Sequence, residues 1–218
     1  MTTNVWEIAS FTVIVAATAT VIMLPPGIAL AWLFARYRFP GRTALDTLVS
    51  LPLVIPPVAT GVILLRLFGR RGVFGGMLET AGVEVIFTWK AVVLAMAIMG
   101  LPLLVRAARA AFEQVDQRYE QIAATLGAGP LRIFLTISLP LASRGVLAGT
   151  LLAFSRALGE FGATVMVAGS IPGSTRTIAA GIYSYTEIGN DAAATGLLLV
   201  SVAIAFAALW CSNRLAHS

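Results

Sequence analysis

Five apolar runs dominate this chain, and each is long enough to cross the hydrocarbon core of a bilayer. A helix of about 20 apolar residues covers the roughly 30 Å of that core. Hydrophobic residues make up 58% of the chain and charged residues 11%, whereas soluble domains carry about 25% charged residues. The sequence therefore predicts an all-α, multi-pass membrane protein forming one domain over residues 1–218, with spans near 8–35, 44–68, 89–110, 145–167 and 192–212.

The arginine and lysine residues between these runs indicate the orientation of the chain, because cytoplasmic connections carry an excess of them. With the N-terminus outside, nine lie in inner connections and four in outer ones. This bias predicts an outer N-terminus, a cytoplasmic C-terminus and a cytoplasmic connection over 106–144. The inner set is Arg36, Arg38, Arg42, Arg106, Arg109, Arg118, Arg132, Arg144 and Arg214, and the outer set is Arg70, Arg71, Lys90 and Arg176.

The residue inventory argues against several other classes of protein. The net charge is +5, but the basic residues are scattered between apolar runs and do not form the patch typical of nucleic-acid binding. The single cysteine, Cys211, and the single histidine, His217, predict neither an internal disulfide nor a metal site. The chain has no G-x-x-x-x-G-K-[ST] loop, so we expect it not to hydrolyse ATP alone. We expect no cofactor and no catalytic residue.

Prolines interrupt two of the predicted spans. The first span contains "LPPG" at 24–27, and the second contains Pro52, Pro56 and Pro57. Each proline removes a backbone donor and bends a helix. In lipid, such a break survives where neighbouring helices or a water-lined cavity satisfy the freed backbone groups. The prolines are therefore either packing kinks or parts of a conduit wall or gate, and the sequence leaves both readings open.

The 106–144 connection is the longest water-compatible stretch of the chain. Its first part is helical in pattern, and Gly127, Gly129 and Pro130 predict the end of that helix. A second, more apolar helix then leads back to the membrane. The first helix carries an apolar face of small and aliphatic residues, which favours either docking on a partner or lying on the lipid headgroups. That face consists of Ile122, Ala123, Ala124 and Leu126.

Arg156 and Glu160 lie in the fourth predicted span, four residues apart and hence on one helix face. A charge exposed at mid-bilayer costs at least about 2.5 kcal/mol, so both must face protein or water. They either form a structural pair that locks helix packing, or line a substrate route on which Arg156 offsets an anion. The next segment, 168–190, is apolar and rich in turn residues. It predicts a loop with one re-entrant turn, in which Arg176 is an interfacial anchor.

The 106–144 connection also resembles the cytoplasmic signature of ABC importer permeases, which reads Glu-Ala-Ala, three residues, Gly, nine residues, Ile, one residue, Leu-Pro. Here Gly127 is followed after nine residues by Ile137-Ser138-Leu139-Pro140. The chain departs from the pattern at Gln121-Ile122-Ala123, with Glu120 one residue early. Further stretches resemble the molybdate permease family of type I importers: "FPGR" (39–42), "LPLVIPP" (51–57), "GRRGVFG" (69–75), "LPLLVRAARAAFEQVD" (101–116), "TLGAGPLRIFLTISLP" (125–140), "RALGEFGAT" (156–164) and "IPGSTRTI" (171–178).

The resemblance implies a type I ABC importer permease fold whose cytoplasmic coupling helix docks on an ATPase subunit. Nine residues are the implied coupling residues: Glu120, Gln121, Ala123, Ala124, Gly127, Ala128, Gly129, Pro130 and Leu131. Six residues are candidates for the pathway or gate: Pro52, Pro56, Pro57, Arg156, Glu160 and Thr164.

The resemblance also implies the partners and the location of the protein. We expect two ABC ATPase subunits, a periplasmic or extracellular oxyanion-binding protein, a second copy of the chain and a bacterial plasma (inner) membrane. The implied function is inward movement of a tetrahedral oxyanion by alternating access, with molybdate favoured over tungstate and sulfate. An alternative of another class, a self-contained secondary carrier, predicts inverted repeats, and the sequence shows none.

The orientation can be tested by cysteine labelling in a variant whose single native cysteine is replaced, Cys211→Ser. We expect Thr3→Cys to react with a membrane-impermeant maleimide in intact cells, and Gln117→Cys to react only after permeabilisation, because 106–144 is predicted to be cytoplasmic. Labelling of Gln117→Cys in intact cells would contradict both the topology and the assignment of the coupling helix.

Overall fold

The computed structural model describes residues 4–217, with side chains as far as residue 208 and at residue 210. The described residues form helices and no strand, which confirms the all-α prediction. Cys211 and His217 lie outside the described side chains. The helices are α1 (Val5–Arg36), α2 (Arg42–Val54), α3 (Pro57–Phe68), α4 (Val73–Thr80), α5 (Trp89–Gln114), α6 (Gln117–Thr125), α7 (Pro130–Ile133), the π-helical turn η1 (Phe134–Ser138), α8 (Leu139–Leu158), α9 (Gly162–Ala168), α10 (Ile178–Glu187) and α11 (Asp191–His217).

Four helical stretches in the described residues are long and apolar enough to cross a membrane, and a bent pair makes a possible fifth. The four are α1, α5, the continuous run Pro130–Leu158 and α11, and the bent pair is α2 with α3. The five predicted runs therefore correspond to real helical segments. The fourth differs most from its prediction, because it starts at Pro130 rather than near residue 145 and ends at Leu158.

The proline pair in α1 does not interrupt that helix, contrary to the prediction. Pro25 and Pro26 lie inside the continuous helix Val5–Arg36. A neighbouring helix supports the chain here, because a Cβ added at Gly27 would lie 2.6 Å from a side-chain carbon of Leu104 in α5. Close contact of this kind is what allows prolines to remain within a membrane helix.

The second and the fourth predicted spans are broken rather than straight. The chain bends by 116° between α2 and α3, with the break at Ile55 and Pro56. Pro52 lies within α2 and does not break it, whereas Pro57 is the first residue of α3. The predicted fourth span, 145–167, is divided between the end of α8 and the short helix α9.

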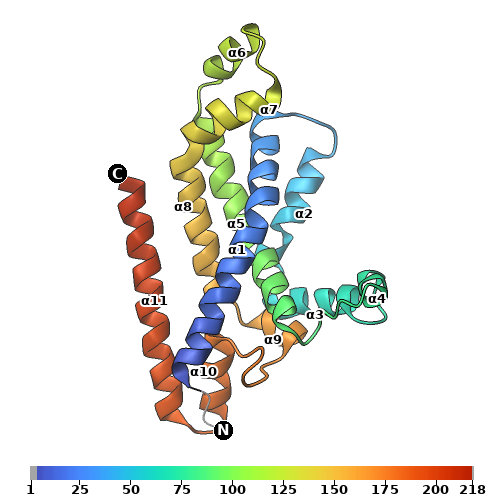
Figure 1. Ribbon diagram of the computed structural model, residues 1–218, viewed down its shortest axis with the longest axis vertical. Coiled ribbons are helices and arrows are strands. Elements are labelled where there is room, and N and C mark those ends of the chain that lie inside the picture. The colour runs from blue at the N-terminus through green and yellow to red at the C-terminus, as the bar shows by residue number, and fades with distance from the viewer. Residues whose placement is uncertain (1–3, 218) are drawn as a thin grey trace.

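α5 lies at the centre of the bundle, packed against α1 on one side and α8 on the other (Figure 1). Its buried face is made of small and flexible apolar side chains, which let neighbouring helices approach closely. α11 packs against α8 and α10 at the edge of the bundle. The buried residues of α5 are Ala91, Val92, Val93, Ala95, Met96, Met99, Gly100, Pro102, Leu104, Val105, Ala108 and Phe112.

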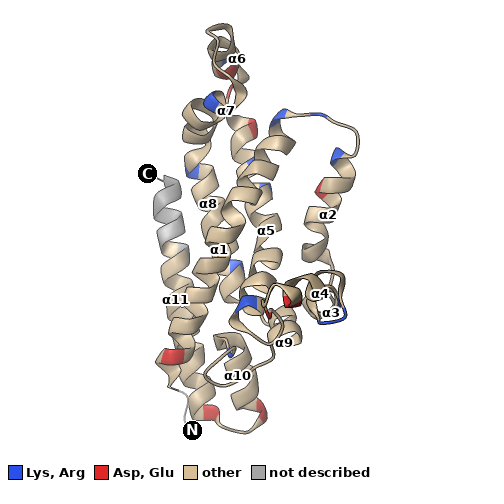
Figure 2. Ribbon diagram, turned by 45° about the vertical axis from the view of Figure 1, so that its right-hand side comes forward, with Lys and Arg blue, Asp and Glu red and all other residues tan. Residues whose placement is uncertain are grey.

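The two ends of the bundle are distinct. α6 and α7 project at one end, hereafter the α6 end, whereas α10 and the first described residues lie at the other, the α10 end (Figure 1). Charged residues gather mostly toward these two ends of the long helices (Figure 2). Exposed aliphatic side chains such as Ile14, Val21, Leu199 and Val202 cover the long helices between them. This distribution fits a bundle surrounded by lipid at its middle.

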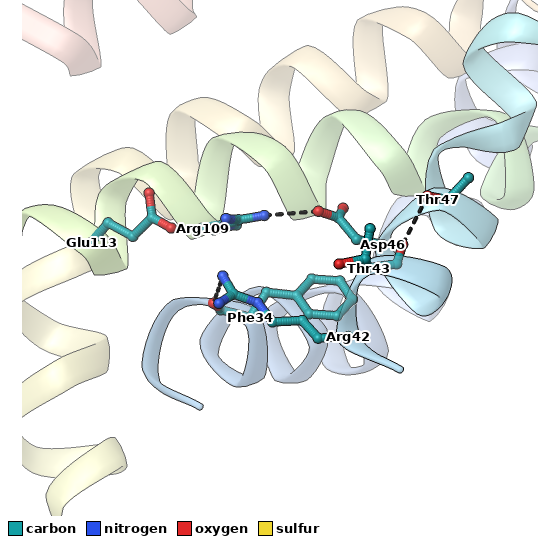
Figure 3. Close-up of polar contacts among 7 residues, drawn as sticks. All are labelled: Phe34, Arg42, Thr43, Asp46, Thr47, Arg109 and Glu113. Carbon is teal, nitrogen blue, oxygen red and sulfur yellow. Dashed lines mark hydrogen bonds and ion pairs between the residues drawn. The ribbon is translucent and has the colours of Figure 1, made fainter. Parts of the chain in front are cut away.

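α2 is attached to the bundle by polar contacts near the α6 end. Every residue of α2 is described, and none is buried. Arg109 of α5 donates to Asp46 Oδ2 of α2 at 2.9 Å and to Glu113 Oε1 at 2.8 Å (Figure 3). Arg42 Nη2 donates at 2.6 Å to the carbonyl of Phe34, near the end of α1 (Figure 3). These bonds add to the packing of the partly buried Leu45 and Val49 against α1 and α5.

Candidate functional site

The helix α6 and the turn that follows it form the first candidate site. Asp116 caps the start of α6, because its carboxylate accepts from the backbone N–H of Arg118 at 2.9 Å. At the other end, Gly127 has φ +84°, and the N–H groups of Gly127 and Ala128 donate to the carbonyls of Ala124 and Ala123, each at 3.0 Å. This pair of bonds is the Schellman arrangement, which needs a residue with positive φ. The predicted helix end at Gly127 is confirmed.

The surface of this turn is apolar. Leu126 is 83% exposed, and Ile122, Leu131 and Leu135 are exposed beside it. A groove of about 550 Å³ lies between α6 and the start of α8 and is lined by Tyr119, Ile122, Ala123, Leu126, Thr136, Ile137, Pro140 and Leu141. Exposed apolar surface next to a groove is typical of a protein docking site.

Most of the predicted coupling residues lie on this surface, but one does not. Six are exposed: Gln121, Ala124, Gly127, Gly129, Pro130 and Leu131. Ala123 and Ala128 are partly buried within the turn. Glu120 is instead largely shielded, and its carboxylate forms an ion pair with Arg36 at the end of α1. No local pattern in the sequence predicted this partner.

The second candidate site lies where the two broken spans meet. A Cβ added at Gly162, the first residue of α9, would lie 2.9 Å from Pro57 Cβ at the start of α3. A Cβ added at Gly61 of α3 would lie 2.6 Å from Met166 Cβ and 2.9 Å from the carbonyl oxygen of Ala163. The two glycines therefore allow the backbones of α3 and α9 to touch, and the breaks near Pro56 and Glu160 lie together.

Arg156 and Glu160 form the ion pair that their spacing predicted. Arg156 Nη1 and Glu160 Oε2 are 2.7 Å apart, with the Glu160 side chain 1% exposed and the Arg156 side chain 28% exposed. Glu160 Oε1 accepts from the backbone N–H of Ala163 at 2.8 Å, so the carboxylate also caps α9. The contacts of Glu160 are those of a structural residue, whereas the Arg156 side chain remains partly exposed.

Two buried hydroxyl groups lie on the helices that form this junction. Thr60 of α3 and Thr164 of α9 are both buried, and neither Oγ1 atom has a hydrogen-bond partner within the described residues. Thr164 was predicted as a pathway residue, whereas Thr60 was not. A buried hydroxyl without a partner is unusual and needs an explanation.

The segment 168–190 differs from its prediction. Its second half is the helix α10 rather than a loop. Arg176 lies within the segment's own structure, donating to Ser170 Oγ at 3.2 Å and to the Ser170 carbonyl at 3.3 Å. Its guanidinium carbon lies 5.5 Å from the centre of the Tyr185 ring, in a cation–π contact. The turn before α10 is therefore ordered by internal contacts that the composition did not reveal.

No group of three histidine, cysteine, aspartate or glutamate residues that could hold a metal ion occurs among the side chains that the structure describes.

Comparison with solved structures identifies the class of fold. The structure is similar to a chain of a bacterial alginate ABC transporter, crystallised in complex with an alginate-bound periplasmic protein, with a TM-score of 0.74, 18% identity and coverage of 96% of this chain and 77% of that one. It is also similar to a chain of the MetNI methionine ABC transporter in inward-facing conformations, with a TM-score of 0.68, 18% identity and coverage of 98% and 93%. The fold is that of an ABC importer permease.

Sequence comparison identifies the family. The chain matches the binding-protein-dependent transport system inner membrane component family over residues 27–216 and belongs to that family. It is 45% identical to the molybdenum transport system permease protein ModB of Escherichia coli, over 97% of this chain and 93% of that protein. The sulfate transport system permease protein CysT of Salmonella typhimurium is 35% identical, over 98% and 78% respectively. The resemblance to importer permeases is confirmed.

The Arg156–Glu160 pair can be tested by its effect on stability. Arg156→Met should destabilise the protein by about 3–5 kcal/mol, because it leaves the Glu160 carboxylate buried without its counter-charge. Arg156→Met/Glu160→Gln should recover much of this loss, since the glutamine oxygen can still accept from the N–H of Ala163. Thermal unfolding in detergent and membrane yield would measure the effect.

Arg66→Met is a matched control, because Arg66 also lies in a membrane segment but is exposed and has no ion pair among the described residues. It should leave unfolding nearly unchanged. An Arg156→Met variant as stable as Arg66→Met would contradict a structural role for the pair.

Proposed function

We propose that this protein is the transmembrane permease subunit of a bacterial ABC importer that moves molybdate inward across the plasma membrane. The observation that carries the substrate is 45% identity, over nearly the full length of both chains, to a molybdenum transport permease. ATP hydrolysis belongs to a separate subunit, since this chain has no phosphate-binding G-x-x-x-x-G-K-[ST] loop. Tungstate, a similar tetrahedral dianion, is an alternative cargo.

The α6 end is the cytoplasmic end in this proposal, and the apolar surface of α6 and its turn receives the ATPase. Leu126 and Leu131 are exposed beside a groove, which supports a surface that a partner covers rather than one that stays free. Two-fold pairing of the chain with a second copy would present two such helices to two ATPase subunits. The α10 end would then face outward and receive the oxyanion-binding protein, with the N-terminus outside and the C-terminus in the cytoplasm.

The substrate route passes the junction of α3 and α9 in this proposal. The Arg156 side chain is partly exposed, and its guanidinium would donate hydrogen bonds to a dianion while Glu160 balances most of its charge. Thr164 and Thr60 have hydroxyl groups without partners in the described residues, and such groups can donate to an oxyanion. The bend at Pro56 and Pro57 would serve as a gate, whereas Pro52 lies within α2 and contributes only to its packing.

Transport follows by alternating access in this scheme. ATP binding brings the two ATPase subunits together and moves the α6 helices with them, which opens the conduit toward the binding protein. Nucleotide release then returns the conduit to its inward-facing state. The α2–α3 bend and the α8–α9 break are the places where such a movement requires the least loss of regular helix hydrogen bonds.

A sulfate importer permease is the second candidate. The 35% identity to a sulfate permease over 98% of this chain is the observation that favours it. The higher identity to molybdenum permeases from several bacteria favours molybdate. A secondary carrier is the remaining alternative, and co-purification of the chain with an ATPase subunit would exclude it.

The substrate can be tested by complementation. A strain that lacks its own molybdate permease but keeps the matching ATPase and binding protein should regain growth on limiting molybdate when this chain is expressed. Expression of this chain in a strain that lacks its sulfate permease should not restore growth on limiting sulfate. Growth of only the second strain would replace molybdate by sulfate and leave the permease assignment intact.

Docking can be tested at Gly127. A Cβ at this residue would meet nothing within 4 Å, so Gly127→Val acts through backbone strain at φ +84° rather than through a clash. We expect the turn to distort, and substrate-stimulated ATPase activity of the assembled complex to fall about tenfold or more while the protein still inserts in the membrane.

Gly82→Val is the matched control, because Gly82 also has a positive φ, +72°, and open space at its Cβ, but lies outside the proposed docking surface. It should retain coupling. Equal coupling in the two variants would argue against a docking role for the α6 turn.

A further inference from the structure

The helix α6 has unusually little to hold it in place. All nine of its residues are described, and none is buried. A helix of this length is marginal on its own, since isolated helices shorter than about 12–15 residues are unstable in water. Its contacts with the rest of the protein are mainly to α7 and η1, and it projects from the α6 end of the bundle (Figure 1). Its orientation must therefore depend on a small number of strong contacts.

Glu120 supplies such a contact. Its Oε1 atom accepts from Arg36 Nε at 2.9 Å and lies 2.8 Å from Arg36 Nη2. The same oxygen accepts from Ser138 Oγ at 2.7 Å. Arg36 Nη2 also donates to the carbonyl of Val115, just after α5, at 3.1 Å. Four separate elements therefore meet at one carboxylate oxygen and one guanidinium: α1, the end of α5, α6 and η1.

The charged groups of this junction are well shielded from water. The side chains of Arg36 and Glu120 are 7% and 16% exposed, and Ser138 is fully buried. Charge-assisted hydrogen bonds are roughly twice as strong as neutral ones, and shielding reduces their screening. A surface ion pair would hold α6 weakly, whereas this one is placed to fix its direction.

An aromatic contact supports the junction from the apolar side. Phe134, the first residue of η1, has its ring centre 5.0 Å from that of Trp32 in α1 and 6.1 Å from that of Phe112 in α5. The π-helical turn is thus fixed to the same two helices that hold Glu120. π-helical turns occur often at functional positions within helices, and here the turn leads directly into α8.

We propose that Glu120 and Arg36 are positioning residues, which fix α6 to the ends of α1 and α5 and to the start of α8, so that movement of α6 is passed to these membrane helices. Glu120 thus acts within the chain rather than by contact with the ATPase. The inference rests on the proposed function only in taking the ATPase as the partner that moves α6.

The central test measures ATP hydrolysed per oxyanion imported, with the full-length permease assembled with its ATPase and binding protein in proteoliposomes. Arg36→Ala and Glu120→Ala should each raise this ratio about tenfold or more, because each removes charge-assisted bonds. Arg36→Lys keeps the charge but not the two-nitrogen geometry, so its ratio should be intermediate. Arg36→Ala/Glu120→Ala should raise the ratio no further than either single variant, since both substitutions remove the same contact.

Arg38→Ala is the matched control. Arg38 lies two residues beyond Arg36, is exposed, and has no ion pair among the described residues, so its removal should leave the ratio at the wild-type value. If Glu120→Ala uncouples while Arg36→Ala is silent, Glu120 acts on the ATPase directly and the proposal is wrong. Glu120→Gln keeps the shape and the acceptor oxygen. If the alanine variants do not fold, Glu120→Gln still provides a variant that should fold, with a ratio raised about threefold.

A second measurement needs neither ATPase nor substrate, and so separates this inference from the proposed function. Spin labels at Gln117 in α6 and Ser143 in α8, in a Cys211→Ser background, would report the position of α6 in the permease alone in nanodiscs. Arg36→Ala and Glu120→Ala should widen the distance distribution, and Arg38→Ala should not. An unchanged distribution in both alanine variants would overturn the proposal even if transport fails. Absence of oxyanion-stimulated ATPase activity in the wild-type complex would instead overturn the proposed function.

Discussion

The contact between α3 and α9 is the constraint on which the middle of this structure depends. Both helices begin at a break in a membrane segment, and a break in hydrocarbon leaves backbone groups without partners unless protein covers them. Gly61 and Gly162 allow the two backbones to meet, since a side chain at either would overlap the opposite helix. Each break is therefore covered by the helix that follows the other.

Glu160 completes this arrangement with one carboxylate. One oxygen accepts from the backbone N–H of Ala163 in the first turn of α9, and the other pairs with Arg156 at the end of α8. The α6 end uses the same chemistry for a different purpose, because Glu120 joins a short exposed helix to buried parts of the chain. In both places a shielded carboxylate fixes a short helix, adding to the packing of α9, which has four buried residues, and replacing packing at α6, which has none.

The sequence predicted what depends on local pattern and missed what depends on distant partners. Apolar runs located the membrane segments, and Gly127 located the end of α6, because chain length and a glycine cap are local signals. The spacing of Arg156 and Glu160 predicted their pairing for the same reason. The pairing of Arg36 with Glu120 joins residues 84 apart, and no local pattern encodes it. Proline content likewise could not distinguish Pro25 and Pro26, which α1 tolerates, from Pro56, where the chain turns by 116°.

The neutrality of the Arg156–Glu160 pair bears on how a permease could pass a dianion without trapping it. An unpaired arginine in a low-dielectric setting would bind an oxyanion strongly, and strong binding slows release, whereas conduction needs sites that are weak enough to leave. The buried Glu160 carboxylate cancels most of the arginine charge, while the partly exposed Arg156 side chain can still donate hydrogen bonds. On the proposed route, the junction would lower the barrier for an oxyanion without holding it. Selection among molybdate, tungstate and sulfate would then fall mainly to the binding protein, which meets the substrate first.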